Sequence, residues 1–205
     1  MFDAQVMHVP VPPTYATTGT TDDIIRPDSS LEALAKLRPV FDKVHGSVTA
    51  GNSSPLTDGA SALLVMREDR AKALGLQPLG ALRAFAYAAT DPGDQLLQGP
   101  AYAAPIALDR AGMNLKDIDL VEMHEAFASP EFAKKLGRPA PLGEVDPDRL
   151  NVHGGSIALG HPFGATGARI IMQALDALAR RGKNTALCTV CAAGGLGAAL
   201  VLERV

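Results

Sequence analysis

The feature of this sequence that most constrains its fold is the alternation of strand-length apolar runs with helix-length amphipathic segments. Strands are predicted at 47–50, 62–66, 79–89, 118–123, 185–190 and 198–203, and helices at 31–37, 67–74, 101–111, 130–136 and 167–180. Because several strands are apolar along their whole length, helices are expected to cover both faces of a mostly parallel sheet. The short glycine-rich turn at 194–197 adds an antiparallel pair at the end. The pattern predicts an α/β fold.

Composition excludes several classes of protein. The chain has 205 residues, 47% of them hydrophobic, and a formal net charge of −3, so an ordered protein that does not bind nucleic acid is expected. No apolar run approaches the roughly 20 residues that span a bilayer. Two cysteines fit a reducing compartment better than a disulfide scaffold. We therefore expect a soluble protein of the cytoplasm.

Three short loops carry the residues suited to chemistry. They are His124–Phe127, Gly160–Pro162 and Cys191–Gly195, and each follows an apolar run or lies beside glycine or proline. A thiol and imidazoles tune one another's pKa, and glycine-rich backbone offers N–H groups to a developing oxyanion. Reactive loops of α/β proteins lie at strand ends, where these three are predicted. The residues alone thus favour an acyl-transfer site with Cys191 as nucleophile.

Each of these residues can also have a purely structural role. Cys191 can be a buried structural cysteine, and both histidines can be satisfied structural residues. Ser54 lies in a polar loop that either lines a ligand groove or simply turns. The spacing of Cys188 and Cys191 suits a redox or zinc pair, but residues three apart on a strand face oppositely, and the chain has no second cysteine pair. No metal site is predicted.

The loops together resemble a known family. His-Glu-Ala-Phe, Gly-His-Pro-Phe-Gly-Ala-Thr-Gly and Cys-Ala-Ala-Gly-Gly, in this order before two strands, are similar to the C-terminal half of a thiolase. The stretch 48–60 also matches this half. The histidine at position 124, residues 91–97 and the two alanines after Cys191 resemble one branch, the thiolase (β) subunits of fatty-acid β-oxidation complexes of the trifunctional type. The resemblance implies one half of a layered thiolase fold with a mixed five-stranded sheet. It divides the chain into 1–46, a remnant of the preceding loop segment, and 47–205, the C-terminal domain.

The resemblance also implies a role for each site residue. Cys191 matches the cysteine that acts as acid and base, rather than the nucleophile that the residues alone favoured. His161 matches the histidine that activates the nucleophile, and His124 takes the place of an asparagine at the oxyanion hole. The backbone N–H of Ala193 matches a second oxyanion donor, and Ser54 matches a serine near the pantetheine arm of coenzyme A. The nucleophilic cysteine belongs to the family's N-terminal half, which is expected to be missing here.

The implied activity is acetyl-CoA C-acyltransferase: 3-ketoacyl-CoA and CoA give acetyl-CoA and a shortened acyl-CoA. CoA would be a cosubstrate, with no metal or other cofactor. Implied partners are a second thiolase subunit in a homodimer and a hydratase/dehydrogenase α-subunit. The helix after residue 127 is shorter than in relatives of this branch. Two alternatives are a non-catalytic half that binds CoA or scaffolds a complex, and a Cys–His thioesterase that uses Cys191.

Overall fold

A four-stranded mixed sheet forms the centre of the structure, in the strand order β3-β6-β5-β4. The strands are β3 (Ala81–Ala89), β4 (Leu120–Met123), β5 (Thr185–Ala192) and β6 (Leu196–Glu203). β4 runs parallel to β5, whereas β6 is antiparallel to both of its neighbours, β5 and β3. The turn at 194–195 that joins β5 to β6 has positive φ at both glycines, so the predicted antiparallel pair is confirmed.

This computed structural model describes residues 5–93, 97–124, 145–192 and 194–205. The chain divides into two units, one of Met1–Leu56 with Ser156–Gly160 and one of Thr57–Gly155 with His161–Val205. The second unit contains the sheet, α2 (Glu68–Ala73), α3 (Gly99–Ala111), α6 (Thr166–Arg181) and the 3-10 helices η2 (Leu115–Asp117) and η3 (Pro147–Arg149). The first contains β1 (Val9–Pro10), β2 (Thr18–Gly19), α1 (Leu31–Ala35) and α5 (Ser156–Leu159).

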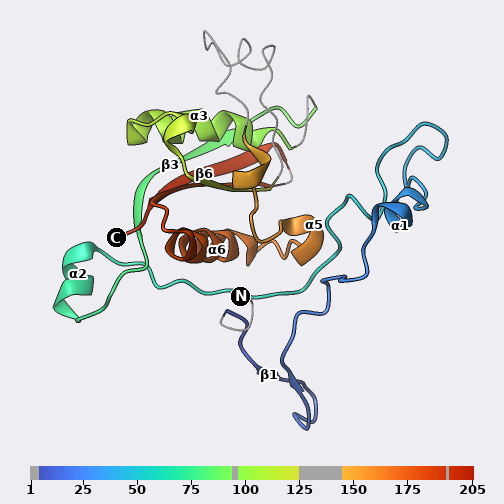
Figure 1. The fold of residues 1–205 in the computed structure, drawn as a ribbon, viewed down its shortest axis with the longest axis horizontal. Helices are drawn as coiled ribbons and strands as arrows, with labels where there is room; N and C mark the ends of the chain where they lie inside the picture. Colours follow the sequence, from blue (N-terminus) through green and yellow to red (C-terminus); the bar gives the residue numbers. More distant parts are fainter. Residues whose placement is uncertain (1–4, 94–96, 125–144, 193) are drawn as a thin grey trace. The chain divides into compact units, whose positions relative to one another are not determined.

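Two helices cover opposite faces of the sheet (Figure 1). α3 packs on β3, β6 and β5 through a row of small side chains, Ala103, Ala104, Ala107 and Ala111, which allow the helix to approach the strands closely. α6 packs on β4 and β5 through larger ones, chiefly Ile170, Leu175 and Leu178. Both helices end at a glycine in the left-handed conformation, Gly112 and Gly182. The central strand β5 is therefore enclosed on both faces.

Most elements predicted for the second unit are present. The helices predicted at 67–74, 101–111 and 167–180 correspond to α2, α3 and α6, and the mixed sheet with helices is confirmed. The helix predicted at 130–136 lies outside the described residues. None of the helices in the described part of the chain has the length and apolar character needed to cross a membrane.

The expected number of strands is wrong for the described residues, which form a sheet of four strands rather than five. The apolar run 62–66 is not a strand, and Leu64 and Val65 each expose 79% of their surface. The strand predicted at 47–50 is also absent, because the Asn52 side chain accepts from Thr49 N and donates to Ser47 O, which turns the chain there. The division of the chain after residue 46 stays a prediction.

We expect Gly99→Ala to destabilise the chain, because a Cβ there would meet the backbone of Leu196 and Gly197 on β6. The expected decrease in the free energy of unfolding is about 1–3 kcal/mol, measured by urea denaturation. Gly167→Ala is the matched control in the first turn of α6, where a Cβ has no atom within 4 Å. This variant should be neutral or more stable by up to about 1 kcal/mol. Equal destabilisation by both changes would contradict the close approach of α3 to β6.

Candidate functional site

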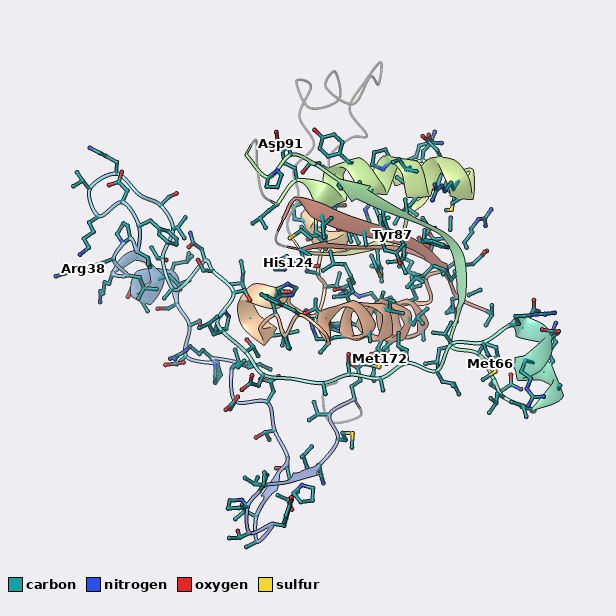
Figure 2. All side chains as sticks on the ribbon, turned by 180° about the vertical axis from the view of Figure 1, so that it is seen from behind. Arg38, Met66, Tyr87, Asp91, His124 and Met172 are labelled. Carbon is teal, nitrogen blue, oxygen red and sulfur yellow. The ribbon has the colours of Figure 1, made fainter. Side chains whose placement is uncertain are left out.

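The candidate site begins where two parallel strands end. Met123, the last residue of β4, lies opposite Thr189 on β5, and the next residue, His124, donates its backbone N–H to Thr189 O at 3.0 Å. Cys191 follows Thr189 by two residues in the same strand. His124 and Cys191 are thus both at the carboxyl ends of neighbouring parallel strands, as the sequence predicted. Figure 2 shows His124 at this end of the sheet.

A side chain that the sequence analysis missed holds the other edge of β4. Asn151 accepts a hydrogen bond from Met123 N at 2.8 Å and donates one from Nδ2 to Met123 O at 3.0 Å. Its own N–H donates to Val121 O at 2.8 Å. The amide side chain therefore substitutes for a strand neighbour immediately before His124. Asn151 has φ 44°, a conformation that asparagine tolerates better than most residues, and this combination is not visible as a sequence pattern.

His161 is held by the first residue of α6. Its Nδ1 lies 2.8 Å from Thr166 Oγ1, and the Thr166 hydroxyl donates to Pro162 O at 3.1 Å. The backbone N–H groups of Ala165 and Thr166 also donate to Pro162 O, at 2.9 and 3.0 Å. The turn between His161 and the helix is therefore closed on itself. Thr166 is fully buried, so water does not compete for these contacts.

The structure brings the two predicted imidazoles together. The rings of His124 and His161 are stacked, with centroids 4.2 Å apart and planes inclined by 19°. The ring of Phe163 lies against His161, with centroids 5.2 Å apart and planes inclined by 55°. Residues 37 positions apart in sequence therefore form one pair at the sheet edge, which the sequence suggested only through resemblance.

Both imidazoles are held in the neutral form. Burial lowers the pKa of His124 below the ordinary 6.5, and the positive charge of Arg169 lowers it further. The pKa of His161 is lowered by burial first, then by the His124 imidazole and by Arg169. A neutral imidazole has one N–H donor and one acceptor nitrogen, so the pair offers both functions near neutral pH.

The two cysteines differ in their surroundings. Cys188 is completely buried in the core between α6 and the sheet, with Sγ 3.8 Å from Ile170 O, and burial strongly raises the pKa of its thiol. Cys191 is 3% exposed and lies outside this core cluster. Neither of the two forms a disulfide bond. Cys188 is therefore a packing residue, and the catalytic role of Cys191 stays a prediction.

Glu122 is a buried acid next to this site. It lies opposite Cys188 in the strand register and is 1% exposed. Burial raises the pKa of its carboxyl group to about 7, although the charges of Arg169 and Arg181 oppose the shift. Within the described ranges, no group of three His, Cys, Asp or Glu side chains is arranged to hold a metal ion.

Two predicted site residues are not brought to the imidazole pair by these contacts. Ala193 lies outside the described residues, so its role as a backbone donor stays a prediction. Ser54 belongs to the first unit, and its part in binding pantetheine also stays a prediction. Its Oγ is enclosed and has no hydrogen-bond partner among the described residues.

Comparison with known proteins identifies the family. A model of the thiolase C-terminal domain matches residues 76–204, and a model of the thiolase N-terminal domain matches residues 1–69. The chain belongs to the thiolase family.

The similar proteins narrow the class further. A 3-ketoacyl-CoA thiolase of Serratia proteamaculans is 58% identical over 97% of this chain, and one of Yersinia enterocolitica is 56% identical over the same share. Among solved structures, an acetyl-CoA acetyltransferase of Bacillus anthracis matches with a TM-score of 0.84 at 36% identity over 100% of this chain and 50% of its own. Human mitochondrial 3-ketoacyl-CoA thiolase matches with a TM-score of 0.74 at 38% identity, over 92% of this chain and 46% of its own. The chain spans 48% of the length of these two bacterial relatives.

We expect Asn151→Ala to loosen the end of β4, because the Met123 N–H and C=O would lose their partners. Each buried group left unpaired costs about 1–3 kcal/mol, so hydrogen exchange of the Met123 amide should become at least about fivefold faster. Asn151→Asp is the control, since it keeps the acceptor for Met123 N and loses only the donor. It should retain the protection of this amide, and unchanged exchange in the alanine variant would contradict the role given to Asn151.

We expect His124→Asn to raise the pKa of His161, because the variant removes the stacked, titratable ring whose electrostatic influence lowers that pKa. NMR titration of the imidazole signals measures this directly, with His153 as an internal control. In the wild-type chain the folded pKa lies below 6.5, so the unfolded chain binds more protons between the two values. Stability should therefore decrease as the pH falls from 6.5 to the folded pKa, and less so in the variant. An unchanged His161 midpoint would contradict the stacked pair.

Proposed function

We propose that this chain is one half of a 3-ketoacyl-CoA thiolase, an acetyl-CoA C-acyltransferase of fatty-acid β-oxidation. In this reaction the bond between the α and β carbons of a 3-ketoacyl-CoA breaks, acetyl-CoA leaves with a proton added at its α carbon, and the remaining acyl group joins the sulfur of CoA. CoA is a cosubstrate, and no metal or other cofactor takes part. The names of the bacterial relatives support this activity.

The observation that carries the proposal is the neutral, stacked pair His124–His161 at the strand end. Cys191 supports it, because it follows by two residues the Thr189 whose carbonyl oxygen accepts from His124 N. Thioester chemistry needs N–H donors for a developing oxyanion and a base for a thiol. In our proposal His161 activates the nucleophilic thiol, and His124 donates to the thioester oxygen together with it. Cys191 exchanges a proton with the α carbon of the acetyl group and with CoA. Ala193 N–H supplies a second oxyanion donor, and Ser54 contacts the pantetheine arm.

The nucleophile itself would come from the part of the enzyme that this sequence does not include. Cys188 and Cys191 are the two cysteines of the sequence, and Cys188 is fully buried. The proposed partners are a second thiolase subunit and the hydratase/dehydrogenase α-subunit of a β-oxidation complex, with the cytoplasm as the compartment. Similarity to bacterial 3-ketoacyl-CoA thiolases supports this assignment.

The test is a fusion in which the remaining portion of the Serratia relative precedes this chain. We expect the chain alone to show no thiolysis of a 3-ketoacyl-CoA and the fusion to release acetyl-CoA. Cys191→Ala should lower kcat of the fusion by roughly 10²-fold or more, as loss of a general acid–base does. Cys188→Ala is the matched control and should retain activity. A folded fusion without turnover, or one indifferent to Cys191→Ala, would overturn the proposal.

The isolated chain also tests the role of Cys191. A thioesterase that used Cys191 as nucleophile would carry an acyl group on this residue after incubation with an acyl-CoA, visible by mass spectrometry of the intact chain and its peptides. We expect no adduct, because the proposed role is proton transfer. An acyl adduct on Cys191 that is absent from Cys191→Ala would show that this thiol is the nucleophile.

A further inference from the structure

Thr166 occupies a position that the sequence analysis did not single out. It is the first residue of α6 and is fully buried, and its hydroxyl oxygen lies between two partners. One is the carbonyl oxygen of Pro162 at 3.1 Å, and the other is Nδ1 of His161 at 2.8 Å. The direction of the hydrogen in each contact decides which nitrogen of His161 carries the proton.

The chemistry of the two partners fixes this direction. A carbonyl oxygen only accepts, and a threonine hydroxyl has one hydrogen to donate. If that hydrogen points to Pro162 O, Thr166 can act only as an acceptor toward His161, and Nδ1 must carry a hydrogen. If it pointed to Nδ1 instead, two oxygen lone pairs would face each other at 3.1 Å in a buried site, which is unfavourable.

We propose that Thr166 is a positioning residue that holds His161 as the Nδ1–H tautomer and leaves the lone pair on Nε2. The hydroxyl accepts a hydrogen bond from Nδ1–H of the imidazole and donates one to the carbonyl oxygen of Pro162, at the start of the same turn. Because Pro162 precedes Thr166 by four residues, helix formation at α6 and orientation of the imidazole depend on the same side chain.

The two ring neighbours of the imidazole do not use its hydrogen-bonding positions. Hydrogen bonds of an imidazole lie in the plane of the ring, whereas His124 stacks on its face and Phe163 is inclined to it by 55°. The hydrogen bond that the ring forms to Thr166 uses Nδ1 and leaves Nε2 on the opposite side of the ring. Thr166 therefore controls the tautomer, while the stacked His124 controls the tilt of the ring.

This assignment deepens the proposed function and, for its catalytic meaning, rests on it. In the proposed reaction the S–H bond of the nucleophilic thiol breaks, its electron pair stays on sulfur, and Nε2 of His161 receives the proton. Nδ1–H stays bonded to Thr166 throughout, so the imidazole is oriented before and after the transfer. A His161 with its hydrogen on Nε2 would have no lone pair there and could not accept the proton.

The experiment is long-range ¹H–¹⁵N NMR of the isolated chain labelled at the histidine ring nitrogens, at a pH where His161 is neutral. His161→Gln assigns the signals. We expect the Nδ1–H pattern in the wild-type chain. Thr166→Val keeps the shape but removes the acceptor, so the tautomer ratio should change by roughly two- to tenfold toward Nε2–H, as loss of one hydrogen bond implies. Thr166→Ser should restore the wild-type ratio.

The outcomes separate this inference from the proposed function. An Nε2–H pattern in the wild-type chain overturns the role of Thr166 even if the variants fail to fold, and so does a folded Thr166→Val chain with an unchanged ratio. The thiolysis test of the fusion addresses the proposed function alone. In an active fusion, Thr166→Val should lower kcat with little change in KM, and Thr166→Ser should recover it, because the tautomer and not the substrate site is altered.

Discussion

The site depends on the parallel pairing of β4 with β5 and on its extension by one residue. β4 is only four residues long, and yet its last backbone groups are bonded on both sides, by Thr189 of β5 and by the amide of Asn151. A short strand end would otherwise fray, because few residues share the cost of ordering it. The bond from His124 N to Thr189 O carries the ladder one residue beyond the strand. The backbone that carries the His124 ring is therefore fixed.

A second constraint is the burial of titratable groups beside α6. Burial raises the pKa of Glu122 to about 7 and that of the Cys188 thiol well above its ordinary value, and it lowers the pKa of both stacked imidazoles. The charge of Arg169 lowers the pKa of Glu122 and of both imidazoles, so it favours the charged form of the acid and the neutral form of the imidazoles. Near neutral pH the two imidazoles therefore offer neutral donors and acceptors.

The sequence predicted those parts of the structure that depend on local pattern. α6 has an amphipathic period and a glycine stop, and β5 and β6 are apolar runs around a glycine turn, so all three were foreseen within a few residues. The run 62–66 has the same composition as a buried strand, but burial depends on a neighbour to pair with, which local pattern does not contain. The roles of Asn151 and Thr166 were not predicted, for a related reason. Each acts through a partner distant in space or through the direction of one hydrogen, and residue type alone suggests only a turn or a helix start.

Residues 57–61, which precede α2 and belong to no strand, contact the turn between His161 and α6. Ser61 Oγ donates to Ala165 O at 2.6 Å, and a Cβ on Gly59 would come within 2.7 Å of Pro162. Residues 57–61 therefore pack against the turn that joins His161 to α6. The backbone of a strand in a sheet is hydrogen-bonded to neighbouring strands, whereas this segment packs against the turn. The residues just before the run 62–66 thus restrain the turn whose threonine orients the imidazole.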